Sequence, residues 1–214
     1  MAKKLWGGRF KKKIDKDFFE FQKSIQYDHK LAKYDIFHSL IHTLALGWAG
    51  ILKPKEKAKL INALKKIREE MKSGKFKYDG NAEDIQTDIQ NKVEKKIWKL
   101  ALKLHTLRSR NDQIAFDEKL YCHYECLDVE KLLRGLVEAI LSLKDKYKKL
   151  SIVGYTHTQR AQKIYFKDYL GAFYYMFERD KKRLSDFCSN LDIHIGAGAL
   201  ARGLEKEHYD KAIK

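Results

Sequence analysis

The most constraining feature of this sequence is the stretch 113–150, which contains no proline and only one glycine, Gly135. Apolar residues recur through it at the spacing of one helix face, which predicts a single amphipathic helix. At a rise of 1.5 Å per residue such a helix is ~55 Å long, which is longer than a compact domain of this size is wide. We therefore expect the helix to project from its domain and to pack its apolar face against another subunit.

Helices are also predicted for most of the remaining chain, because one proline and 12 glycines among 214 residues leave few helix breakers. Residues 1–27 lack a sustained helical pattern, and we expect an irregular arm there. The other expected helices run over about 28–52, 54–73, 83–97 and 164–190. The predicted fold class is all-α. It combines an N-terminal helical domain with its arm at 1–112 and the start of a long-helix bundle at 113–214.

The chain is strongly basic, with a formal net charge of +16. Its lysines are scattered along the predicted helices, as is typical of a solvated surface. The arginines are scarcer and fall partly in polar clusters, at Arg9, Arg108, Arg110 and Arg160. The charge is compatible with an anionic substrate or with nucleic acid. No nucleic-acid recognition motif is present, so we expect a small anionic ligand and no nucleic-acid partner.

Several classes of protein are disfavoured by what the sequence lacks. The three cysteines are too few and too far apart for a disulfide framework. His38 and His42 lie one helical turn apart, which can suit zinc, but no third ligand accompanies them, so we expect no metal site. The first residues lack the apolar core of a signal peptide, and the apolar run 40–52 is too short and interrupted to cross a bilayer. We therefore expect a cytoplasmic protein that does not bind a membrane.

A first polar cluster, residues 103–113, directly precedes the long helix. Asn111 and Asp112 are short side chains that can accept hydrogen bonds from the first N–H groups of that helix. Arg108 and Arg110 carry planar guanidinium groups that match carboxylate or phosphate. The cluster therefore predicts an anion site at the start of the helix. A well-capped helix with surface arginines explains the same residues, and the sequence leaves that alternative open.

A second polar cluster, residues 154–162, breaks one predicted helix and opens the next. His157 is a candidate proton-transfer group, because an unperturbed imidazole titrates near neutral pH. Thr156 can donate a hydrogen bond to a carboxylate. A loop histidine satisfied by its neighbours is the alternative. Because helix junctions far apart in sequence can meet in a bundle, we predict that Asn111 and His157 converge on one pocket for an acid.

Taken together, these clusters and their separations resemble argininosuccinate lyase. The wider superfamily of that enzyme includes fumarase, aspartase, adenylosuccinate lyase and delta-crystallin. The resemblance covers nearly all of residues 3–203. The motifs that carry it are Leu5–Phe10, Ser24 with Tyr27-Asp28, Glu83-Asp84-Ile85, Leu104–Thr106 with Arg108–Gln113, Gly154–His157 with Gln159–Gln162, and Gly196–Ala201.

The resemblance implies a fumarase/aspartase-like helical fold and a homotetramer whose long helices form a common bundle. It implies reversible β-elimination of argininosuccinate to arginine and fumarate, a reaction of arginine biosynthesis, without a cofactor. The same resemblance assigns the site residues. The catalytic residues would be His157 and Thr156, and the substrate would be bound by Ser24, Asp28, Arg110, Asn111 and Gln159.

Among the departures from the family pattern, three bear most directly on function. Gln86 stands where the family usually has histidine, and it can form hydrogen bonds but cannot carry a proton. Leu107 replaces a usual glycine, so its side chain is expected to crowd the backbone or the ligand. Family members are longer, and their remaining half carries a Ser-rich loop with the catalytic base serine. We therefore consider two hypotheses. The chain is part of a truncated or split enzyme that needs a C-terminal half, or it is a decayed homologue that acts only as a binding or structural protein.

Overall fold

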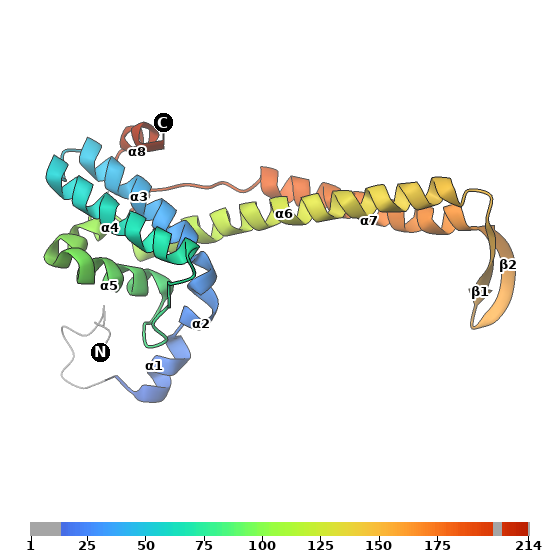
Figure 1. Cartoon of the computed structure of the whole chain (residues 1–214), viewed down its shortest axis with the longest axis horizontal. Helices are drawn as coiled ribbons and strands as arrows, with labels where there is room; N and C mark the ends of the chain where they lie inside the picture. Colours follow the sequence, from blue (N-terminus) through green and yellow to red (C-terminus); the bar gives the residue numbers. More distant parts are fainter. Residues whose placement is uncertain (1–13, 199–202, 214) are drawn as a thin grey trace. The chain divides into compact units, whose positions relative to one another are not determined.

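The computed structural model describes residues 14–198 and 203–213. Among these residues the secondary structure is helical apart from one two-stranded antiparallel sheet, which confirms the predicted helical class (Figure 1). The motif at residues 5–10, Arg9 with it, and residues 199–202 of the Gly-rich stretch lie outside the described residues. The elements are α1 (Lys16–Gln22), α2 (Ile25–Asp28), η1 (His29–Leu31), α3 (Ala32–Trp48), α4 (Pro54–Lys72), α5 (Ile85–Ile97), η2 (Trp98–His105), α6 (Arg110–Lys146), β1 (Ser151–Thr156), β2 (Gln159–Tyr165), α7 (Phe166–Ser189) and α8 (Lys206–Ile213).

The chain forms two compact units. The first contains the described residues up to Tyr121 together with those from Ile193 onward, and the second contains residues 122–192. Helix α6 therefore belongs to both. The division at residues 112 and 113 that the sequence suggested stays a prediction. No helix in the described part of the chain combines the length and apolar character that a bilayer crossing requires.

The core of the first unit lies where α3, α4, α5 and η2 pack together. Apolar residues at helical spacing on each helix are fully buried there, which explains why these helices associate. Each such side chain contributes roughly 1.5–3 kcal/mol by leaving water. The largest of them are Ile36, Leu46, Leu60, Leu64, Ile67, Ile85, Ile89 and Leu104.

Local sequence signals set the helix ends in this unit. Pro54 occupies the first turn of α4, and the Glu56 carboxylate accepts a hydrogen bond from the Lys53 backbone N–H at 3.0 Å. Gly74 follows the end of α4 with φ +69°, a conformation that glycine adopts without strain. Asp84 precedes α5 and accepts a hydrogen bond from the Thr87 backbone N–H at 2.6 Å. These observations confirm the predicted starts of the second and third helices.

The second unit consists of the rest of α6, the hairpin β1–β2 and α7. The strands pair with Ser151 opposite Tyr165 and Thr156 opposite Gln159. His157 and Thr158 form the two-residue turn with φ of +47° and +63°. Positive φ at both turn positions matches the twist of antiparallel strands. The sequence predicted only a break between helices here, so the hairpin is a finding of the structure.

Candidate active site

The first polar cluster leads into α6 as predicted, but a different residue caps the helix. Ser109 Oγ accepts a hydrogen bond from the Asn111 backbone N–H at 3.2 Å, and the Ser109 carbonyl accepts one from Gln113 N at 3.1 Å. Asp112 instead accepts a hydrogen bond from the Gly198 backbone N–H. Because Asn111 is not needed as a cap, its exposed side chain remains available at the start of the helix.

Arg110 is held by three side chains from two helices. Its Nε lies 3.4 Å from Asp84 Oδ2, its Nη1 donates to Gln113 Oε1 at 2.6 Å, and its Nη2 donates to Thr87 Oγ1 at 3.3 Å. The ion pair is largely shielded, since the Arg110 and Asp84 side chains are 20% and 11% exposed. The guanidinium group is therefore fixed between the start of α5 and the start of α6.

Ser24 and Asp28 lie together at the start of α5. Ser24 Oγ donates to Asp28 Oδ2 at 2.6 Å, and the Ile85 backbone N–H donates to Asp28 Oδ1 at 3.1 Å. Burial raises the pKa of Asp28, against the lowering effect of its hydrogen bond with Ser24. Asp28 Oδ1 therefore links α2 to the start of α5, while Oδ2 binds Ser24 at the start of α2, so within the protein this residue already has a structural role.

A cavity of about 500 Å³ opens beside Arg110, and all its lining residues belong to the first unit. Arg108, Arg110 and Asn111 contribute hydrogen-bond donors to its wall, and Asp84 and Gln86 come from the start of α5. Convergent donors of this kind suit a carboxylate or another small anion. Among the predicted site residues, the structure thus brings Arg110 and Asn111 together in one cavity.

A buried polar network forms part of the wall of this cavity. Gln113 Nε2 donates to Asp35 Oδ1, and Arg108 Nη1 donates to Ser39 Oγ at 3.2 Å. Asp117 accepts a hydrogen bond from Gln86 Nε2 at 3.1 Å, while its other oxygen lies 3.2 Å from His38 Nδ1. These contacts link α3, α5 and α6. The network therefore fixes several of the side chains that line the cavity.

Burial dominates the titration of this network. It raises the pKa of Asp35 to about 6 and that of Asp117 to about 7, while the charge of Arg108 works in the opposite direction on both. Burial and the charge of Arg108 together lower the pKa of His38 to about 3. His38 is consequently neutral at physiological pH and can donate its Nδ1–H to Asp117.

His42 lies one helical turn from His38, a spacing that can suit zinc, but both of its ring nitrogens already have hydrogen-bond partners. Its Nδ1 lies 2.7 Å from the Tyr209 hydroxyl and its Nε2 lies 2.9 Å from the Thr106 carbonyl oxygen. Burial lowers the pKa of His42 to about 2. Sequence reasoning missed this network. The available signal was a set of polar residues, such as Asp35 and Asp117, on helix faces that are otherwise apolar.

The residues of the second polar cluster lie on the hairpin of the second unit. Thr156 and Gln159 face each other as the last strand pair, and His157 is the first turn residue, with an exposed side chain. The positive φ of His157 is the one that a two-residue hairpin turn requires, so it reflects the turn. The predicted meeting of Asn111 and His157 stays a prediction, as do the roles of all seven predicted site residues.

Leu107 also has a left-handed backbone, with φ +56°. Glycine adopts this conformation without strain, which gives a physical reason for the glycine that the family pattern has at this position. The Leu107 side chain is 42% exposed and does not line the cavity. The expectation that it crowds the ligand therefore finds no support within the first unit.

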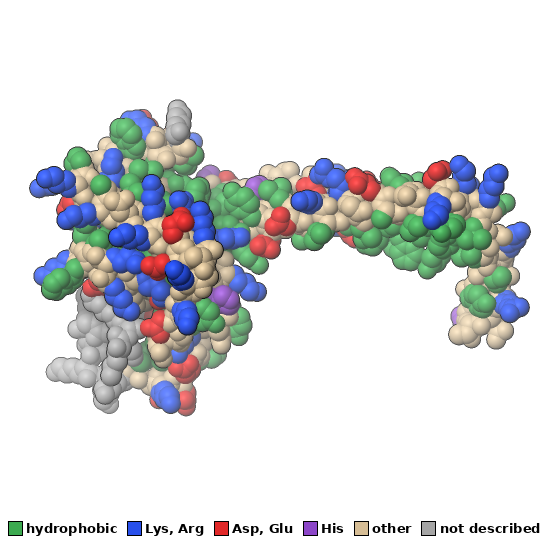
Figure 2. Space-filling view, viewed as in Figure 1, with side chains coloured by type: hydrophobic (Ala, Val, Ile, Leu, Met, Phe, Trp, Pro, Cys, Tyr) green, Lys and Arg blue, Asp and Glu red, His purple; other side chains and the backbone are tan. Residues whose placement is uncertain are grey.

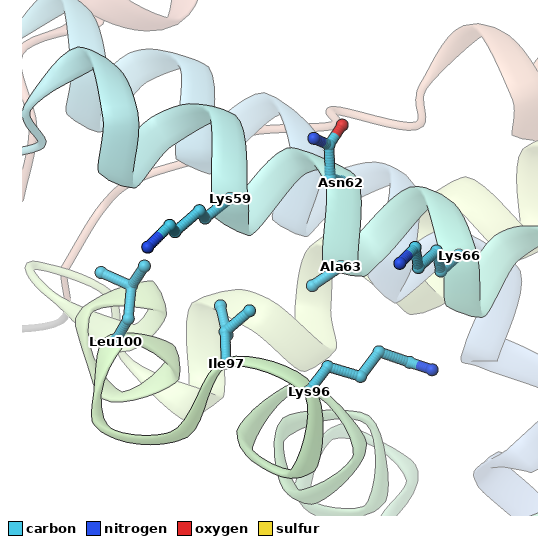
Figure 3. A pocket seen from close by; sticks show the side chains of 7 residues that line it. All are labelled: Lys59, Asn62, Ala63, Lys66, Lys96, Ile97 and Leu100. Carbon is cyan, nitrogen blue, oxygen red and sulfur yellow. The ribbon is translucent and has the colours of Figure 1, made fainter.

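A second depression of about 390 Å³ lies on the first unit between α4, α5 and η2 (Figure 3). Three lysines surround an apolar floor, but one of them, Lys96, already pairs with Glu70 at 2.7 Å. No predicted site residue lies there. The residues that line it are Lys59, Asn62, Ala63, Lys66, Lys96, Ile97 and Leu100. The cavity beside Arg110 is therefore the better candidate for the active site.

A helical chain with arginine and asparagine side chains around a cavity at a helix junction is the arrangement expected of an enzyme or binding protein for small carboxylic acids. Residues 8–209 match the family described as lyase, and the chain belongs to that family. Argininosuccinate lyase of Desulforamulus reducens is 43% identical over 199 residues, covering 92% of this chain and 43% of the relative. The enzyme of Carboxydothermus hydrogenoformans is 41% identical, covering 92% of this chain and 44% of the relative. The chain thus spans less than half the length of these curated relatives.

Solved structures show the same fold. EDDS lyase in complex with formate has a TM-score of 0.71 at 21% identity, covering 89% of this chain and 38% of that protein. Fumarate lyase from Mesorhizobium sp. BNC1 has a TM-score of 0.65 at 14% identity, covering 92% of this chain and 48% of that protein. At these identities the likeness extends to the fold alone.

Proposed function

We propose that this chain supplies the N-terminal portion of an argininosuccinate lyase, which cleaves argininosuccinate reversibly to arginine and fumarate. One observation carries the proposal. Arg110 and Asn111, which the family resemblance assigns to substrate binding, line a single cavity in which three partners fix the guanidinium group. The matching relatives at about two fifths identity support the same substrate.

The proposed reaction removes a proton from the carbon beside a substrate carboxylate. The electron pair forms the C=C bond of fumarate, and the C–N bond to the guanidinium nitrogen of arginine breaks. In the transition state negative charge spreads into the adjacent carboxylate as an aci-carboxylate, so donors aimed there accelerate the reaction. Arg110 and Asn111 are the proposed donors. Ser24 and Asp28, which lie beside the start of α5, are also proposed to bind the substrate.

We also assign roles in this reaction to three residues of the hairpin, Thr156, His157 and Gln159. Thr156 and Gln159 would hydrogen-bond the substrate, and His157 would assist proton transfer or polarise the site. The family resemblance assigns the base to a serine on a loop that this sequence does not contain. The proposed reaction therefore also needs the residues that family members carry in their C-terminal half, and residues 1–214 by themselves are expected to bind substrate without turning it over.

The second unit suggests how copies of the chain assemble. Of its residues, only Val137, Ile140 and Gly171 are buried, whereas large apolar side chains along α6 and α7 are exposed, including Leu132 at 75% and Tyr175 at 63% (Figure 2). Exposed apolar surface of this extent marks an association site. We propose a cytoplasmic homotetramer in which these helices form a common bundle, and in which His157 of one copy meets Arg110 and Asn111 of another.

A complementation assay tests the catalytic proposal. The chain is mixed with the C-terminal part of the Desulforamulus reducens enzyme, and the absorbance of fumarate is followed after argininosuccinate is added. The two halves of that relative serve as the positive control, and this chain carrying Arg110→Ala serves as the negative control. We expect fumarate from the positive control and from the mixture that contains the unaltered chain, and none from the mixture with Arg110→Ala. No fumarate, where the relative's own halves are active, contradicts the proposal.

Light scattering tests the assembly. We expect the mass of four copies for the unaltered chain and a smaller species for Leu132→Lys, which places a charge on the proposed interface. A monomer at micromolar concentration would contradict the assembly.

A further inference from the structure

The position of Arg110 depends on Asp35, which acts on it only through Gln113. Its partner Gln113 has a carboxamide, which can donate only through Nε2 and accept only through Oε1. Gln113 Oε1 accepts from Arg110 Nη1 at 2.6 Å, and Gln113 Nε2 donates to Asp35 Oδ1. The orientation of this one amide group therefore decides whether Arg110 meets an acceptor or a donor.

Asp35 is the group that settles this orientation. An ionised carboxylate only accepts hydrogen bonds, so it can bind the Nε2 end of Gln113 and not the Oε1 end. Asp35 is 1% exposed and Gln113 is 2% exposed, so water does not compete for either group. The charge of Arg108 helps to keep Asp35 ionised above its pKa of about 6, against the charge of Asp117 and the effect of burial. At neutral pH the Gln113 amide has one favourable orientation.

The geometry leaves Arg110 prepared for a planar ligand. A guanidinium group carries one N–H on Nε and a pair on each Nη. Gln113 and Thr87 each accept a hydrogen bond from one Nη of Arg110, whereas Asp84 forms an ion pair with Nε at 3.4 Å without a hydrogen bond. One N–H on each Nη is therefore left without a hydrogen bond to the described residues. Two donors in that arrangement match the two oxygens of a carboxylate.

We propose that Asp35 and Gln113 are positioning residues, which hold the Arg110 guanidinium group so that it binds a substrate carboxylate with both Nη groups. The proposal rests on the function proposed above, because it takes Arg110 as the ligand of a carboxylate. It adds two residues to which neither the family resemblance nor the proposed reaction gives a role.

The first experiment measures the position of Arg110 without any ligand. The ¹⁵N NMR signals of the Arg110 side chain, assigned by their loss in Arg110→Lys, are recorded for the full-length chain at pH 7. Restricted rotation should give resolved Nη–H signals in the unaltered chain. Asp35→Ala and Gln113→Met should each merge them into an averaged signal. Ser39→Ala, which removes another buried hydrogen bond of α3, should leave them resolved. Resolved signals in both Asp35→Ala and Gln113→Met would overturn the proposal.

The second experiment measures the consequence for binding. Calorimetric titration of the full-length chain with fumarate at pH 8 should give about tenfold weaker affinity for either single variant, equivalent to ~1.4 kcal/mol. The double variant should be no weaker than Gln113→Met alone, because both changes break the same link. Losses that add in the double variant overturn the proposal, because they indicate a general structural effect.

The two experiments separate this inference from the proposed function. If the unaltered chain does not bind fumarate but the NMR signals behave as expected, the positioning holds and carboxylate binding by this chain fails. If the unaltered chain binds fumarate and neither variant alters the affinity or the NMR signals, the positioning fails and the proposed function stands. Gln113→Met keeps the test valid if Asp35→Ala does not fold, because it breaks the same link while leaving Asp35 in place.

Discussion

Asp84 divides two tasks between its carboxylate oxygens, and paired substitutions can separate them. Oδ1 accepts from the Thr87 backbone N–H at 2.6 Å and caps α5, whereas Oδ2 pairs with Arg110 at 3.4 Å. Asp84→Asn keeps a good capping side chain and removes the charge. Asp84→Ala removes both. The difference between the two variants therefore measures the cap, and the difference between Asp84→Asn and the unaltered chain measures the ion pair.

The structure sets the expected magnitudes. Loss of a helix cap costs about 1 kcal/mol. A partly shielded ion pair contributes roughly 0.2–1 kcal/mol. We therefore expect Asp84→Asn to lower the free energy of unfolding by about 0.5 kcal/mol and Asp84→Ala to lower it by about 1.5 kcal/mol. With a typical urea dependence of ~2 kcal/mol/M, the urea midpoints fall by about 0.25 M and 0.75 M.

Tryptophan fluorescence is the suitable assay, because Trp48 and Trp98 both lie in the first unit with α5. Asp15→Ala is the matched control. Asp15 caps α1 through the Asp17 and Phe18 backbone N–H groups at 3.0 Å, but α1 has no buried residue, so its loss should leave the midpoint unchanged. The reasoning is refuted if Asp84→Asn costs as much as Asp84→Ala, or if Asp15→Ala costs as much as either.

Three further predictions concern stability. Leu107→Gly relieves a positive φ and should raise the thermal midpoint by roughly 1–3 °C, since about 0.5 kcal/mol is expected after the entropy cost of glycine. Tyr209→Phe leaves buried His42 Nδ1 without its partner and should cost about 1–3 kcal/mol in urea unfolding. The raised pKa of Asp117, about 7, means that the folded state binds a proton that the unfolded state releases near pH 4, so this contribution to stability is present at low pH and lost as pH rises towards 7. We therefore measure the free energy of unfolding in urea for Asp117→Asn and for the unaltered chain. The value for the variant minus the value for the unaltered chain should be more positive at pH 8 than at pH 5.

Each of these has a clear opposite result. A lower thermal midpoint for Leu107→Gly would show that the Leu107 side chain contributes more by packing than its backbone conformation costs. An unchanged urea midpoint for Tyr209→Phe would show that water replaces the hydroxyl group at His42. For Asp117→Asn, an equal difference from the unaltered chain at both pH values would show that Asp117 is ionised throughout.

The local features of the fold were predictable because they depend on neighbours in sequence. Pro54, Gly74 and Asp84 signal helix ends by their own backbone preferences or by capping the next turn, and the structure has them in those places. The same holds for the long helix, which begins three residues earlier than expected, at Arg110. In the candidate site, Arg110 and Asn111 could be predicted as candidates because charged and amide groups are conspicuous next to an apolar pattern.

The features that were missed depend on residues far apart in the chain. The hydrogen bonds of Asp35 with Gln113 and of Gln86 with Asp117 need three helices to be packed first, and polar residues on otherwise apolar helix faces do not reveal in sequence which of them pair. The hairpin was missed because the mostly polar residues 156–163 interrupt the apolar alternation of its strands. Its signal was β-branched and aromatic residues on both sides of the turn, such as Val153 and Tyr165.

The contact between Tyr209 and His42 has a consequence for synthesis of the protein. Helix α8 packs against α3, and Gly198 binds Asp112, so the first unit takes its last pieces from the end of the described chain. A ribosome adding about 5–20 residues per second exposes α3 to solvent for several seconds or more before α8 emerges. During that interval His42 and the apolar surface around it lack their cover. The nascent chain is therefore expected to need a chaperone, or an early partner copy, until residues 203–213 have been translated.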